Sequence, residues 1–163
     1  MHRAFRSPGR VLALLRRKAY FELIERVAEA LHVTTQDDAQ TRRQYAQGLT
    51  EQGQITAALC VLEGLIDRTA DDSEEDAEAR GLLGRAYKQL CVEAASADPR
   101  TRSPARTRLH LQRSMDAYAG VYLDAPATHL WHGINAVAVA ARAGRLRDRV
   151  SRPWRRPGAE IRC

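Results

Sequence analysis

The sequence contains few of the features that mark a membrane, disulfide or cysteine metal protein. In its 163 residues no apolar run approaches the roughly 20 residues that a transmembrane helix needs. The three cysteines, Cys60, Cys91 and Cys163, are an odd number without C-x-x-C spacing, so we expect neither a disulfide scaffold nor a cysteine metal site. We therefore expect a protein of the reducing cytoplasm that contains no membrane span.

Catalytic motifs are also missing. The sequence has no G-x-S-x-G elbow and no G-x-x-x-x-G-K-[ST] phosphate loop, and no strand pattern precedes the glycines of "GLLGR". Clustered carboxylates occur only between Asp71 and Glu78, where a run of acids is typical of a solvated face. We expect no catalytic residue, no cofactor and no enzymatic activity.

Two histidines offer a metal alternative. His129 and His132 are three residues apart, which places them on one side of a helix. A zinc site needs further ligands, and no glutamate lies in this stretch to complete an H-E-x-x-H motif. We expect a helix start with Trp131 packed on the preceding hairpin and Asn135 bonded to a buried carbonyl; a small metal enzyme is the alternative.

Charge is unevenly distributed around the net value of +6. A basic start is followed by an acidic middle over residues 37–98 and a strongly basic end over residues 99–163. In the Arg-rich end from Arg142 to Arg162, Trp154 stands among arginines and could stack on a base. No recognised nucleic-acid fold accompanies it, so a nucleic-acid-associated protein acting through its Arg-rich ends is the alternative function.

Apolar residues recur at steps of three and four along most of the chain, which is the helical period. The pattern predicts five or six helices and no strand, hence an all-α fold of antiparallel helix pairs. We expect a leading basic amphipathic helix within residues 1–36, repeats over 37–144 and a basic Pro/Arg-rich tail over 145–163. An insertion near 92–107, with a loop over 97–108, interrupts the repeats.

The repeat period is close to that of tetratricopeptide repeats. Small residues at packing positions let the helices of a hairpin approach, and larger ones fill the grooves between hairpins. Leu83, Gly84 and Tyr87 reproduce the L-G-x-x-Y part of the signature. The predicted repeat-packing residues are Tyr45, Ala46, Ala58, Leu83, Gly84, Tyr87, Tyr118 and Trp131.

The order "RGLLGRAYKQL", "SMDAYAGVY" and "HGINAVAVAARAG" is more specific than a generic repeat. Over roughly residues 10–144 it resembles the TRAF-binding region of apoptosis signal-regulating kinases, a tetratricopeptide-like domain that also occurs in bacterial proteins. The resemblance implies a tetratricopeptide-like α-solenoid and a regulatory or scaffold module without catalytic residues. Nothing in the sequence resembles the kinase, and the repeat pattern stops after Gly144.

Helical-repeat arrays bind partners on a concave surface lined by the first helix of each pair. The corresponding positions are Arg43, Gln47, Arg85 and Lys88, which suit an acidic peptide segment or another protein. Ordinary solvated charge is the alternative interpretation of these four residues. The third repeat is incomplete, so the apolar face of "INAVAVAA" lacks its usual covering helix. We expect either the tail, through Val150 and Trp154, or a second molecule or partner to cover this face, with self-association as one form of the second alternative.

Overall fold

The computed structural model describes residues 8–69 and 73–151, with side chains described as far as Gly144. All the regular structure in this part of the chain is helical, which confirms the predicted all-α fold. The helices are α1 (Pro8–Arg17), α2 (Phe21–Val33), α3 (Ala39–Glu51), α4 (Ile55–Ile66), α5 (Glu74–Ser96), α6 (Pro104–Asp124) and α7 (Leu130–Ser151).

Helix boundaries follow local capping chemistry. The carboxylate of Asp38 accepts a hydrogen bond from the Thr41 amide at the start of α3, and the Ser73 hydroxyl accepts one from the Asp76 amide at the start of α5. Gly53 follows α3 with a φ of +77°, a left-handed conformation that glycine adopts without a Cβ clash. Each cap satisfies a backbone group that the helix itself leaves unpaired.

The described part contains more helices than the five or six predicted, partly because the leading segment is not one helix. The chain turns at Ala19, where φ is +56°, and the Tyr20 amide donates to the Leu15 carbonyl. This turn lets α1 and α2 pack on each other through Leu12, Ile24 and Ala28. The prediction of a single helix was wrong because the apolar period continues through the turn and neither glycine nor proline marks it.

Two further boundaries differ from the prediction. Ser103 caps α6 and Pro104 occupies its first turn, so the connection between α5 and α6 is shorter than the loop expected over 97–108. Helix α7 continues past Gly144 to Ser151, so the helical part extends into the segment expected to be a tail. The rest of that segment, with Trp154, lies outside the described residues.

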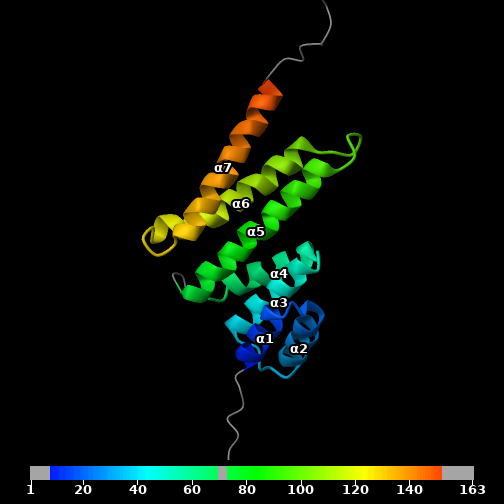
Figure 1. Cartoon of the computed structure of the whole chain (residues 1–163), viewed down its shortest axis with the longest axis vertical. Coiled ribbons are helices and arrows are strands. Elements are labelled where there is room, and N and C mark those ends of the chain that lie inside the picture. Colours follow the sequence, from blue (N-terminus) through cyan, green and yellow to red (C-terminus); the bar gives the residue numbers. More distant parts are fainter. Residues whose placement is uncertain (1–7, 70–72, 152–163) are drawn as a thin grey trace, which may run out of the picture.

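The helices form successive antiparallel pairs that stack from α1 and α2 at one end of the molecule to α7 at the other (Figure 1). One core cluster joins α3, α4 and α5 through Ala46, Leu62 and Ala79. Another joins α5, α6 and α7 through Cys91, Tyr118 and Val139. Neighbouring pairs therefore share their buried surface, as expected of a helical-repeat array.

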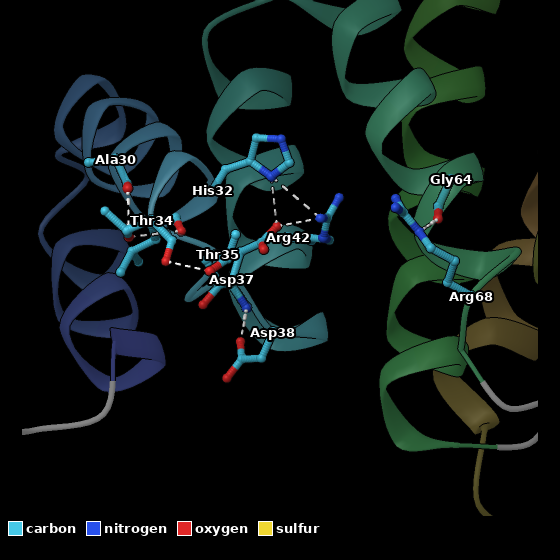
Figure 2. Close-up of polar contacts among 11 residues, drawn as sticks. Ala30, His32, Thr34, Thr35, Asp37, Asp38, Arg42, Gly64 and Arg68 are labelled. Atoms are coloured by element: carbon cyan, nitrogen blue, oxygen red, sulfur yellow. Dashed lines mark hydrogen bonds and ion pairs between the residues drawn. The ribbon is translucent and has the colours of Figure 1, made fainter.

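The α2–α3 connection is held by polar contacts (Figure 2). The Asp37 carboxylate lies between the His32 ring, with Nδ1 at 3.0 Å, and the Arg42 guanidinium. The Thr34 hydroxyl donates to the Ala30 carbonyl at 2.9 Å and so satisfies one of the last carbonyls of α2. These contacts connect the end of α2 to the start of α3.

Candidate partner-binding groove

A groove of about 580 Å³ lies between the first helices of successive pairs. Its walls come from the C-terminal end of α3, the middle of α5 and the middle of α7. Buried Ile55, Leu111 and Val139 form an apolar base. A groove of this size and lining can accept a peptide segment or a small ligand.

The rim of the groove is mainly basic. Arg85, Lys88 and Arg142 line it, and Glu51 is the one carboxylate among its lining residues. The Arg85 guanidinium is 2.8 Å from the Glu51 carboxylate, in a pair that is partly exposed. Three cations against one anion leave the groove with a net positive charge, which favours an anionic ligand.

Lys88 is positioned by contacts from two other helices. Its Nζ donates to Asn135 Oδ1 at 3.3 Å and lies 5.8 Å from the centre of the Tyr118 ring. The Asn135 amide in turn donates to the Trp131 carbonyl at 2.9 Å. The ammonium group of Lys88 is therefore held near the groove, at the junction of α5, α6 and α7.

The four predicted groove residues do not all lie together. Arg85 and Lys88 line the groove, whereas Arg43 and Gln47 are absent from its lining. Arg43 Nε is 2.6 Å from the Glu75 carboxylate, and Gln47 Oε1 accepts from Arg16 at 3.4 Å. Arg43 therefore connects α3 to α5, and Gln47 connects α3 to α1.

Arg142 is a groove residue that the sequence reasoning did not select. In the sequence it is the first residue of the Arg-rich end over 142–162, and in the structure it lies in α7, whose helical spacing also places Ala138 and Val139 on the groove. Burial raises the pKa of the Cys91 thiol, and the nearby Arg142 opposes that rise. The sequence signal for Arg142 is its position three residues after Val139, on the same side of a helix that the apolar pattern already predicts.

Most of the predicted repeat-packing residues are buried between helices. Ala46, Ala58 and Tyr118 are fully buried, Tyr87 and Gly84 are buried, and Leu83 and Tyr45 are partly buried against core clusters. Trp131 differs, because 56% of it is exposed. Its ring still meets the Tyr118 ring at a steep angle, with the ring centres 5.7 Å apart, so Trp131 contacts the preceding pair while much of it faces solvent.

The two histidines of the H-x-x-H stretch occupy a packing site. His132 is buried, and its Nε2 donates to the Ala77 carbonyl at the start of α5 at 3.1 Å. The rings of His129 and His132 meet edge-on with their centres 5.4 Å apart. Over the described residues, no group of three or more His, Cys, Asp or Glu is placed to hold a metal ion.

None of the helices in the described ranges combines the length and hydropathy required to cross a membrane.

The stacked helix pairs and the groove between their first helices define a helical-repeat protein of the tetratricopeptide type. The sequence matches the family model of the Tetratricopeptide Repeats-Sensor domain over residues 18–140. The chain therefore belongs to this family. Repeats of this class generally mediate protein–protein interaction or act as scaffolds, and they are generally non-enzymatic. No curated protein and no solved structure matches the sequence significantly.

Proposed function

We propose that this chain is a regulatory interaction module whose groove binds an acidic segment of a partner protein. The observation that carries the proposal is the three-cation rim of Arg85, Lys88 and Arg142 above an apolar base. The rim suits carboxylates of the partner, and the base suits apolar side chains between them. The family description, a repeat sensor, supports a regulatory role, as does the resemblance to the TRAF-binding region of signalling kinases.

The cations of the rim are available to a partner to different extents. Arg85 already has Glu51, so an acidic segment must compete with a carboxylate of the chain itself. Within the described residues, the Lys88 ammonium group contacts the neutral Asn135 oxygen and the Tyr118 ring and has no carboxylate partner. We therefore assign the main attraction to Lys88 and Arg142 and a secondary contribution to Arg85.

Peptides of designed composition test this proposal. Fluorescein-labelled peptides that alternate Glu or Asp with Leu are titrated with the protein and followed by anisotropy, beside peptides in which Gln and Asn replace the acids. We expect the acidic peptides to bind at least roughly tenfold more tightly and their binding to weaken as salt increases, because surface charges are screened.

Neutralising the rim gives the matched comparison. The Lys88→Gln, Arg142→Gln double variant is expected to lose roughly tenfold in affinity for the acidic peptide. The control removes two cations elsewhere, with Arg26→Gln on α2 and Arg108→Gln on α6, both exposed and outside the groove. Equal losses in the two double variants, or equal binding of acidic and amide peptides, would contradict the proposal.

A further inference from the structure

A second cavity, of about 520 Å³, lies on the opposite side of α5. It is open to solvent on one side and is lined by the start of α4, the C-terminal half of α5, the α5–α6 connection and the N-terminal half of α6. It shares no lining residue with the groove. Leu59, Leu90 and Ala94 give it an apolar wall. Its volume is within the range of small-molecule sites, about 300–1,000 Å³.

The facing wall is cationic. Arg106, His110 and Arg113 line the cavity at positions i, i+4 and i+7 of α6, so they form one stripe on one side of the helix. Arg106 and Arg113 carry the positive charge of this stripe, on either side of His110 along the helix. Among the described residues, the guanidinium of Arg106 has no ion-pair partner, and its place at the cavity gives it access to one.

An aromatic support fixes this stripe. The rings of Tyr87 and His110 are stacked, with centres 6.1 Å apart and an interplanar angle of 24°. The Tyr87 hydroxyl accepts a hydrogen bond from Arg113 at 3.1 Å and donates one to Glu63 at 2.7 Å. The Arg113 guanidinium also lies 5.4 Å from the centre of the Tyr87 ring. Arg113 is thus held in place, while Arg106 and the partly exposed His110 face the cavity.

The lining of the cavity contains one acid, Glu93, against the two arginines. Glu63 accepts the Tyr87 hydroxyl, and Glu93, which lines the cavity, accepts from Gln89 at 3.2 Å. His110 Nδ1 is buried, and within the described residues it has no hydrogen-bond partner. A cavity with a cationic wall, an apolar wall and a flat aromatic stack has the chemistry of a site for an amphipathic anion.

We propose that this cavity binds a small organic anion whose apolar body lies against Leu59 and Leu90 and whose carboxylate or phosphate head lies between Arg106 and His110. The head group supplies the negative charge that the α6 stripe lacks. The apolar body occupies a volume that a hydrated inorganic ion does not fill. The site is separate from the groove, so its test does not depend on the partner proposed there.

The imidazole of His110 provides a direct readout. Burial lowers its pKa, and the neighbouring guanidinium groups of Arg106 and Arg113 lower it further. An anion bound beside the ring favours the protonated form and raises that pKa again. The proton signals of His110 in NMR spectra, assigned by their loss in His110→Gln, report this change on the full chain.

The probes are phenyl phosphate, phenylacetate, inorganic phosphate and, as a neutral analogue, benzyl alcohol. We expect saturable shifts of the His110 signals and a raised His110 pKa with the aromatic phosphate, the aromatic carboxylate or both. The comparison of these two anions identifies the head group. Benzyl alcohol lacks the anionic head and should not raise the His110 pKa. Inorganic phosphate lacks the apolar body and should bind at least roughly tenfold more weakly than phenyl phosphate.

Arg106→Gln should weaken binding roughly tenfold, measured by calorimetry, because it removes one charge-assisted contact. Arg108→Gln, two residues along α6 and absent from the cavity lining, is the control and should bind as the parent does. Three results would overturn the proposal. They are no saturable change with either aromatic anion, inorganic phosphate binding as tightly as phenyl phosphate, and equal losses in the Arg106 and Arg108 variants.

Discussion

At the scale of single residues, α5 and α6 approach each other closely at Gly84. A Cβ placed on Gly84 would lie 2.8 Å from Cε2 of the Tyr118 ring, closer than ordinary packing allows. The Ser114 hydroxyl donates to the Gly84 carbonyl at 2.7 Å across the same interface. The L-G-x-x-Y part of the repeat signature thus has a direct physical reason: the missing side chain of Gly84 is the space that the Tyr118 ring occupies.

Gly84→Ala should therefore destabilise the protein even though alanine is the better helix former. The added methyl group meets a fully buried ring, and overpacking of this kind typically costs about 1–3 kcal/mol. Gly120→Ala on α6 is the control, because its Cβ would meet nothing within 4 Å. Urea unfolding followed by circular dichroism should show that Gly120→Ala raises the free energy of unfolding by about 0.5–1 kcal/mol. Equal stabilities of the two variants would contradict the close contact.

His132 should make stability depend on pH. Burial lowers its pKa below the ordinary value of 6.5, so the unfolded chain takes up a proton more readily than the folded chain. Stability should thus be fully present above about pH 6.5 and fall as the pH decreases through and below that value. The groups that face the ring are the Ala77 carbonyl, His129, Glu78 and the hydroxyl-bearing ring of Tyr118, whose own pKa burial raises to about 12.

His132→Gln is the variant that isolates this effect. Glutamine can donate to the Ala77 carbonyl but does not titrate, so its melting temperature should decrease less between pH 7.5 and pH 5.5. These pH values lie about one unit on either side of the ordinary histidine pKa. Other groups that titrate in this range, His110 among them, remain in both proteins and cancel in the comparison. Parallel melting curves for the parent and the variant would show that His132 does not contribute.

At the scale of elements, the fold class and several helix ends could be predicted because their signals are local. Asp38, Ser73 and Gly53 are cap residues whose chemistry acts within one turn. Ser103 and Pro104 are also a typical helix start, but the arginines and prolines around them lack an apolar period, so the sequence pattern predicts a loop there. The turn at Ala19 carried none, because tertiary packing of α1 on α2 selects that conformation.

The candidate site could be predicted only in part for a related reason. Arg85 and Lys88 follow from their repeat positions, and both line the groove. Arg43 occupies an equivalent position, but Glu75 on α5 captures its side chain, and a single sequence does not record such a cross-helix pair. The cationic stripe of Arg106, His110 and Arg113 has a regular spacing, yet it becomes visible only when α6 is known to begin at Pro104.

At the scale of the whole molecule, α5 separates two surfaces of different character. The groove opens along α3, α5 and α7, and the second cavity opens between α4, α5 and α6. Both have basic walls, although the middle of the sequence is acidic, because Glu63, Glu75 and Asp76 are engaged in contacts with Tyr87, Arg43 and Arg80. The basic side chains of α5, α6 and α7 therefore dominate the charged lining of these two sites.

The outer face of α7 gives the molecule a third surface. Leu130, Ile134 and Val137 are exposed by 61%, 69% and 70%, and in the described ranges no helix covers them. Their spacing of four and three residues is that of a coiled-coil seam. We infer that a second copy of the chain covers this stripe, because a twofold axis brings the same apolar stripe of both α7 helices into contact.

Sedimentation velocity over a concentration series tests this association. The parent protein should shift from monomer to dimer as its concentration rises, and Ile134→Glu should move that transition to at least roughly tenfold higher concentration by placing a charge in the apolar seam. Leu109→Glu introduces the same charge at a half-exposed leucine of α6, outside the stripe, and should leave the transition in place. A parent that remains monomeric throughout the series, or equal shifts in the two variants, would show that α7 does not pair with its copy.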